Sequence, residues 1–372
     1  MVIMAIDHVR DFFHDDAYAH NPLDLQTTTP QLYFTRWITH FCAPTFLFLA
    51  GTSAYLMGLK KTKAELSSFL IKRGFWLILV EVGIVTLSVT FSLVYPVLIL
   101  QVIWATGISM IILGLLVRFP YGVILIIACC VIFGHNLLDY PEAAHHYQVG
   151  FWWDLIHNGR FTYYSYANNH GIVIVYAFLP WTGIMLLGYC FGKIYEPAVN
   201  SVQRRKTLFV IGAAFILLFV LLRLINAYGD PFPWTAQRNK LYTFLSYMNV
   251  NKYPPTLMYT CITLGPALIF LALTEKVRNN FSSILIIYGR VPFFYYVIHF
   301  YLIHTLNILL LIFVGWPSND ILITHFPFRP QFGLHLWGVY LVWLVVIAIM
   351  YPLCKWYNEY KNTHRQWWLS YV

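Results

Sequence analysis

Residues 206–226 read KTLFVIGAAFILLFVLLRLIN, and this stretch decides the class of fold. About 20 predominantly apolar residues in a helix are enough to cross the ~30 Å hydrocarbon core of a bilayer. Eight further runs are as long or nearly so, at about 33–58, 69–92, 94–117, 120–138, 171–193, 254–274, 285–313 and 333–354. Because a backbone in lipid must satisfy its own hydrogen bonds, these runs predict helices. They are too long and too continuous for the alternating strands of a β-barrel.

The composition supports a polytopic membrane protein. Of the 372 residues, 59% are apolar and only 10% are charged, whereas soluble domains carry about 25% charged residues. We therefore predict an all-α bundle of about ten transmembrane helices, forming a single domain over residues 1–372 in a lipid bilayer. The first helix, Met1 to about His14, is short for a span. It is expected to be either a half-helix or a helix whose N-terminal half is missing, and we favour the second.

The distribution of basic residues predicts the orientation. With ten helices, sixteen of the 24 lysines and arginines fall on one side, Lys60, Lys61 and Lys63 among them, and seven fall on the other. Basic residues concentrate in cytoplasmic loops, so both termini are expected in the cytoplasm and the protein in the inner (cytoplasmic) membrane. The net charge of +9 therefore reports orientation, and no nucleic-acid partner is expected.

The loops expected outside the cell are the longer ones, at about 15–32, 139–170, 227–253 and 314–332. No internal repeat is evident, which weighs against a transporter built from duplicated halves. Gly188 and Gly192 form a small-residue motif that is typical of close helix packing. The adjacent pair His145 and His146 cannot easily point at one ion, so no metal site is expected.

Several ionisable side chains fall inside the apolar runs, where they are costly and tend to be functional. They are Asp7, His8, Asp11, Arg36, His40, Glu81, Arg223, His299 and His304. Depth along the helices places imidazoles from three helices in one layer, with Lys252 capping that layer from outside. Convergence of titratable groups at one depth favours a functional site.

Each of these residues also has a structural interpretation. A single histidine in a membrane is more often held by an interhelical hydrogen bond than used in catalysis. Asp7 and Asp11 could be neutralised by Arg10 or Arg36, and Glu81 could pair with a buried base such as Arg223.

Several segments occur together in a familiar order. They are DHVRDFF at 7–13, TRWITHFCAP at 35–44, FLFLAG at 46–51, LPWTG at 179–183, NKYPP at 251–255 and GRVPFFYY at 289–296. In this combination the chain resembles the bacterial DUF1624 membrane proteins. These are related to the catalytic domain of heparan-α-glucosaminide N-acetyltransferase, within the transmembrane acyltransferases. That family normally starts its first helix with an Arg-Gly-containing half that this chain lacks.

The resemblance implies transfer of an acetyl group from cytoplasmic acetyl-CoA to an external sugar or glycan. The reactive histidine of the family could correspond to His8 or His40. We predict that His8 is the general base, oriented by Asp11, with His40 as its partner; His299 is the alternative base. Arg36 or a second histidine could stabilise the oxyanion.

The remaining expected roles concern binding. Substrate-binding residues are predicted to be Arg36, Glu81, Lys252, His299 and His304, and the CoA phosphates are predicted to contact Lys72, Arg73 and Arg290. Two other functions stay open: a transporter or flippase that uses the same polar core, and a non-catalytic scaffold. A homodimer is a further expected partner arrangement.

Overall fold

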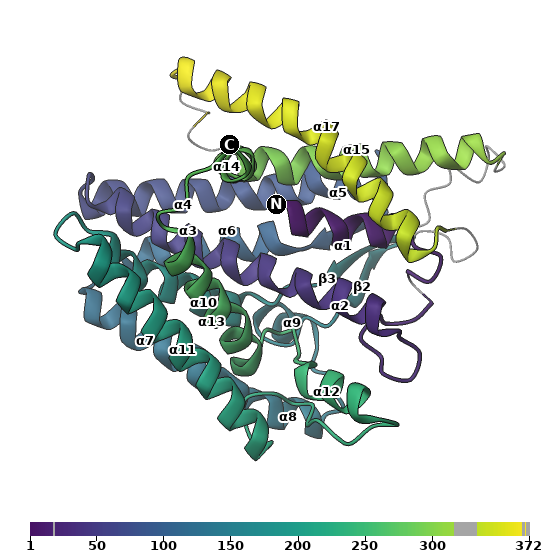
Figure 1. The fold of residues 1–372 in the computed structure, drawn as a ribbon, viewed down its shortest axis with the longest axis horizontal. Helices are drawn as coiled ribbons and strands as arrows, with labels where there is room; N and C mark the ends of the chain where they lie inside the picture. The colour runs from purple at the N-terminus through teal and green to yellow at the C-terminus, as the bar shows by residue number, and fades with distance from the viewer. Residues whose placement is uncertain (18, 316–332, 367–368, 370–372) are drawn as a thin grey trace. The chain divides into compact units, whose positions relative to one another are not determined.

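The structure is a computed structural model that describes residues 1–17, 19–315, 333–366 and 369. Helices dominate it, as the apolar runs predicted (Figure 1). Within the described residues, six helices are long and apolar enough to cross a membrane. They are Pro30–Gly58, Tyr121–Ala144, Ser201–Ile225, Leu257–Thr274, Pro292–Phe313 and Leu336–Thr363. The chain is a helical polytopic membrane protein. Most of the expected loop 314–332 lies outside the described residues.

The chain folds into two compact units, each assembled from separate segments. Unit 1 contains Met1–Cys42, Gly83–Val97 and Val277–Val372, and unit 2 contains Ala43–Val82 and Leu98–Lys276.

Where it is described, unit 1 has helices as its regular elements, apart from Val97, where β1 (Val97–Leu100) begins. Its elements are α1 (Val2–Phe13), α2 (Pro30–Ile38), the 3-10 turn η1 (Thr39–Phe41), α5 (Thr86–Thr90), α14 (Asn280–Arg290), α15 (Pro292–Phe313) and α17 (Leu336–Thr363). The short helix α1 packs against α17, α15 and α2 (Figure 1). It therefore lies at the centre of the unit, and its polar residues face partners from several helices.

The apolar run predicted at 285–313 is two helices in the structure. Helix α14 ends at Arg290 and α15 begins at Pro292, with Val291 between them at φ −129° and ψ 53°. Proline has no amide proton to continue a helix, but its fixed φ suits the first helical position. The helix therefore restarts at Pro292.

Unit 2 combines most of the remaining helices with a small sheet. Its elements are α3 (Cys42–Gly58, from Ala43 onward), α4 (Lys63–Val80), β1 (Val97–Leu100), α6 (Val102–Leu116), α7 (Tyr121–Gly134), η3 (His135–Leu138), α8 (Asp139–Ala144), α9 (Phe151–Ile156), β2 (Thr162–Ala167), β3 (His170–Ile174), α10 (Phe178–Phe191), η4 (Gly192–Tyr195), α11 (Ser201–Ile225), α12 (Lys240–Met248) and α13 (Leu257–Thr274). A π-helix, η2 (Glu81–Val85), follows α4 where the chain leaves the unit.

The sheet corrects two of the predicted spans. Its strands lie in the order β1-β3-β2, with β2 and β3 antiparallel. The runs at 94–117 and 171–193 both begin as strands, and their helices start only at Val102 and Phe178. A short apolar run rich in β-branched residues cannot be assigned to helix or strand by periodicity alone. Burial of Leu100 and Ile174 in a shared apolar cluster decides in favour of strands here.

Glycines allow the long helices of unit 2 to approach closely. Between α11 and α13, a Cβ on Gly212 would lie 2.7 Å from the Gly265 carbonyl oxygen. Gly74 of α4 and Gly107 of α6 are in the same relation. Gly188 of α10 lies against the backbone of α3, which confirms the packing role predicted for its motif.

Candidate functional site

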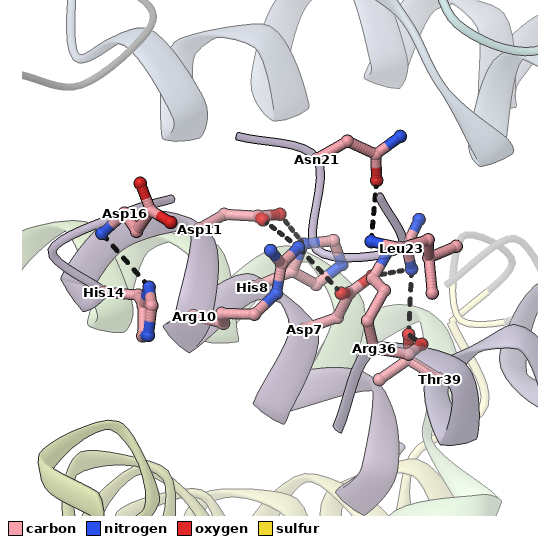
Figure 2. A network of polar contacts seen from close by, with 10 residues as sticks. All are labelled: Asp7, His8, Arg10, Asp11, His14, Asp16, Asn21, Leu23, Arg36 and Thr39. Atoms are coloured by element: carbon pink, nitrogen blue, oxygen red, sulfur yellow. Dashed lines mark hydrogen bonds and ion pairs between the residues drawn. The ribbon is translucent and has the colours of Figure 1, made fainter. Parts of the chain in front are cut away.

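An ion-pair network joins α1 to α2 in unit 1 (Figure 2). Arg36 Nη1 lies 2.9 Å from Asp7 Oδ2, while Arg10 Nη2 lies 3.2 Å from Asp7 Oδ1. The same Arg10 nitrogen lies 2.6 Å from Asp11 Oδ1. Residues three and four apart share one helical face, which places Asp7, Arg10 and Asp11 together. The hypothesis that arginines neutralise both carboxylates is confirmed.

The network is largely buried. The side chains of Arg36 and Asp7 are 10% and 13% exposed. Arg36 Nη1 also donates to Thr39 Oγ1 at 2.9 Å, and Thr39 Oγ1 donates back to the Arg36 carbonyl. These contacts fix the turn η1, which also carries the buried His40. Arg36 thus has a structural task, in addition to any role with substrate.

Two of the predicted histidines lie next to each other. The rings of His8 on α1 and His299 on α15 have centroids 5.2 Å apart, and Phe300 lies 4.3 Å from His8. His299 is fully buried, whereas the His8 side chain is 18% exposed. The pair therefore contains one accessible imidazole backed by one inaccessible imidazole.

The hydrogen bonds of His299 define its tautomer. Its Nδ1 lies 2.6 Å from the Tyr296 carbonyl oxygen and 3.0 Å from that of Tyr295. Carbonyl oxygens only accept, so Nδ1 carries the proton and Nε2 carries a lone pair. Nε2 is buried and has no hydrogen-bond partner among the residues that the structure describes. With Nδ1 donating, the Nε2 lone pair can accept a hydrogen bond.

His304 has a different environment on the same helix. Its Nδ1 donates to the Ser88 carbonyl oxygen at 3.1 Å, and its ring stacks on Phe91 at 3.9 Å. Asn307, one turn further, donates to the Phe12 carbonyl oxygen. Asn307 was not among the predicted site residues, although a polar amide in an apolar helix is itself a sign of function.

Asp11 lies at ion-pair distance from His8, and its closer contact is with Arg10. His8 Nδ1 and Asp11 Oδ2 are 3.9 Å apart, which is too long for a hydrogen bond. The nearer partner of Asp11 is the Arg10 guanidinium at 2.6 Å, and a charge-assisted contact of this kind is the stronger one.

Glu81 and Arg223 have partners other than each other. The buried Glu81 accepts a hydrogen bond from the Trp104 amide, in the first turn of α6, where a carboxylate complements the helix dipole. Arg223, near the C-terminal end of α11, donates to four main-chain carbonyls, those of Phe232, Ser246, Tyr247 and Asn249. Carbonyls at the end of α12 and in the adjoining loops, and an amide of α6, account for these contacts rather than the expected ion pair.

The predicted lysine and arginine contacts fall in both units. Lys252 is buried in unit 2, with its ammonium 5.0 Å from the centre of the Tyr253 ring. Lys72 and Arg73 lie on α4 in unit 2, and Lys72 is exposed. Arg290 is exposed at the end of α14 in unit 1.

Long apolar helices with buried ion pairs and imidazoles define a polytopic membrane protein with a polar interior. Residues 1–224 match the family described as heparan-alpha-glucosaminide N-acetyltransferase, catalytic. Because the match covers more than half of the chain, the chain belongs to this family, as its motifs indicated. No curated protein and no solved structure matches the chain. The matched region includes α1 and α2 but not His299.

Proposed function

We propose that this protein transfers an acetyl group from acetyl-CoA to an external sugar or glycan, with His8 as the general base. Membership of a membrane acetyltransferase family supports the reaction class. The observation that carries the proposal further is the contact between the partly exposed His8 and the buried His299, 5.2 Å apart between ring centres.

The chemistry requires one base and no redox step. An acceptor oxygen or nitrogen attacks the thioester carbonyl carbon, and the carbon–sulfur bond breaks. The acceptor proton passes to the imidazole and from there to the departing CoA sulfur. General-base catalysis of this kind contributes about 10²–10⁴-fold. His8 suits the role because it is the accessible member of the pair.

His299 is assigned a supporting role. Its Nε2 lone pair can stabilise a protonated His8 beside it, and its Nδ1 is held by two main-chain carbonyls. His40 and Asp11 stay as the partners predicted from sequence, and Arg36 or a second histidine stays as the oxyanion donor. Substrate-binding roles for Glu81, Lys252 and His304 also stay predictions.

The acyl donor needs cationic contacts at the cytoplasmic face. CoA carries phosphate groups, which lysine and arginine bind through charge-assisted hydrogen bonds. The exposed Lys72 and Arg290 fit this requirement, and Arg73 lies beside Lys72 on α4. This assignment rests on both termini being cytoplasmic, in the inner membrane. A homodimer is compatible with it.

The test is an assay of the purified full chain with labelled acetyl-CoA and a panel of amino sugars and cell-envelope glycans. His8→Gln should reduce label transfer by at least about 10²-fold, while the exposed His364→Gln should leave it unchanged. If His8→Gln keeps near-full activity and His299→Gln loses it, the general base is His299 on α15 rather than His8. Flux of an unmodified solute without label transfer would identify a transporter or flippase and refute the proposal.

A further inference from the structure

A second cluster of titratable side chains lies in unit 2, between residues 135 and 157. Asp139 and Glu142 belong to α8, and His157 caps the C-terminal end of α9. Their exposed fractions are 6%, 1% and 0%. One donor atom from each of the three lies within 4.8 Å of the other two. His135 of η3, 4% exposed, lies against the same group.

Hydrogen bonds connect the residues of this cluster, but two of its carboxylate oxygens form none with the described residues. His157 Nδ1 and Trp153 Nε1 each lie 2.6 Å from Glu142 Oε1. Asn136 Nδ2 donates to Asp139 Oδ2 at 2.7 Å. The other oxygens, Asp139 Oδ1 and Glu142 Oε2, are buried with no hydrogen-bond partner in the described part of the chain.

Within the described residues, the basic side chain paired with this cluster is His157, 2.6 Å from Glu142, and a protonated imidazole there balances one of the two carboxylates. No lysine or arginine of the described residues forms an ion pair with Asp139 or Glu142. The Arg160 guanidinium acts on Asp139 electrostatically, but it lies over the Tyr147 ring, 3.8 Å from its centre. Burial of the second carboxylate without a paired cation is costly. A divalent cation among these oxygens would offset that cost.

We propose that Asp139, Glu142 and His157 bind a divalent transition-metal ion, with Zn²⁺ the expected occupant. Carboxylate oxygens and imidazole nitrogens are ligands of such ions, at about 2.0–2.2 Å. Donors of one tetrahedral ion then lie about 3.4 Å apart, so a cluster spread over 4.8 Å needs only small side-chain movements. The Asp139 Oδ1 and Glu142 Oε2 atoms are the available oxygens.

His135 has a positioning role in this site. Its Nδ1 lies 3.0 Å from His157 Nε2, a contact that holds the His157 ring in place. Ligating histidines are commonly oriented through their second nitrogen in this way. Binding must also release a proton, because a ligating nitrogen needs its lone pair.

The site is closed to solvent, and the second carboxylate oxygen of Asp139 or Glu142 would fill the fourth position of a tetrahedral ion, so the site is structural rather than catalytic. All of its side chains are at most 6% exposed, whereas catalytic metal sites keep an open position. The ion would tie the outer end of α7, through η3 and α8, to α9. It is independent of the proposed acetyl transfer, because its residues are distinct from the His8–His299 pair.

The test measures metal in the full chain rather than activity. The protein is purified in detergent, stripped with dipicolinate, reloaded with Zn²⁺ or Co²⁺, and its metal content is determined by mass spectrometry. One ion per chain and tetrahedral Co²⁺ absorption bands are expected. Glu142→Gln and His157→Gln should bind at least about tenfold more weakly, and the exposed double variant His145→Gln/His146→Gln should bind normally.

Two outcomes would overturn the proposal. Wild-type protein that takes up less than a stoichiometric amount of either metal while remaining folded would show that the cluster is only hydrogen bonded. Equal binding by the cluster variants would place the metal elsewhere. If the variants fail to fold, the unfolding temperature of the wild type decides: it should fall on stripping and recover on reloading, and no change refutes the site.

Discussion

At the scale of single residues, the contact between Arg36 and Asp7 shows how a charged pair is accommodated between apolar helices. Removing one partner of a buried ion pair leaves an uncompensated charge, which costs more than the pair itself contributes. The pair therefore specifies how α1 meets α2, as well as adding stability. His8 is carried on the same helix, one residue after Asp7, so its position depends on this contact.

A double-mutant cycle tests the Arg36–Asp7 pair. Asp7→Asn and Arg36→Gln should each lower the free energy of unfolding by about 3–5 kcal/mol. The double variant should lose less than the sum, with a coupling of about 0.5–3 kcal/mol. Chemical unfolding in detergent measures all four proteins. The exposed pair His20 and Asp16 is the control, and Asp16→Asn should change stability by less than about 1 kcal/mol. Additive effects at Asp7 and Arg36 would contradict the assignment.

At the scale of elements, the crossing of α11 and α13 depends on the absence of side chains at two positions. Gly212→Leu should destabilise the protein, because even a Cβ at this position would lie 2.7 Å from the Gly265 carbonyl oxygen. The expected loss is about 1–3 kcal/mol or more. Thermal unfolding in detergent measures it.

The matched control is a glycine with space around it. Nothing lies within 4 Å of a Cβ built on Gly122 in α7. Gly122→Ala should therefore stabilise the helix by about 0.5–1 kcal/mol. A Gly212→Leu variant as stable as the wild type would show that the two helices do not meet at this glycine.

The segment between α11 and α13 is organised by Asp230. Its carboxylate accepts hydrogen bonds from the Phe232 and Asn251 amides at 2.9 and 2.8 Å, and from the Thr256 hydroxyl at 3.1 Å. Burial nevertheless raises the pKa of Asp230 above its ordinary value, because it disfavours the charged form more than these donors favour it.

The raised pKa predicts a pH dependence. A folded-state pKa above the unfolded value means that the native state binds the proton more tightly. The contribution of Asp230 to stability therefore increases as the pH falls from 7 through the raised pKa, and is lost as the pH rises again. As the pH falls, the unfolding temperature of the wild type should rise relative to that of Asp230→Asn. A wild-type unfolding temperature that falls relative to that of Asp230→Asn would contradict the prediction.

At the scale of the whole molecule, the orientation in the membrane follows from charge. Sixteen basic residues fall on the predicted cytoplasmic side and seven on the other. Basic residues resist translocation, so this asymmetry predicts the direction of each span. The roles proposed for His8 and for the CoA-binding residues both depend on it.

Cysteine accessibility tests the orientation. In a background without the six native cysteines, Asn168→Cys in the β2–β3 connection should react with an impermeant reagent from outside the cell. Lys63→Cys and Lys276→Cys should react only after the membrane is opened. All three positions are exposed, so access to the reagent is limited by the membrane alone. Labelling of Lys63→Cys in intact cells would show that the topology is opposite to the predicted one.

The sequence alone determined the membrane class, the helical architecture and the family. These follow from features that are local in the chain. A long apolar run is stable as a helix in the hydrocarbon core, whichever segments pack beside it. The Asp7–Arg36 pairing was also open to prediction, since charges on membrane helices commonly pair with an opposite charge at a similar depth.

Only the tertiary structure decided which distant residues meet. It made strands of Val97–Leu100 and His170–Ile174, because burial in a shared cluster outweighs local preference where an apolar run is short. It placed His8 beside His299, and it gathered Asp139, Glu142 and His157 into one buried group. Such meetings depend on how whole helices pack. Packing energy is summed over many side chains from separate segments, so no single stretch of sequence contains it.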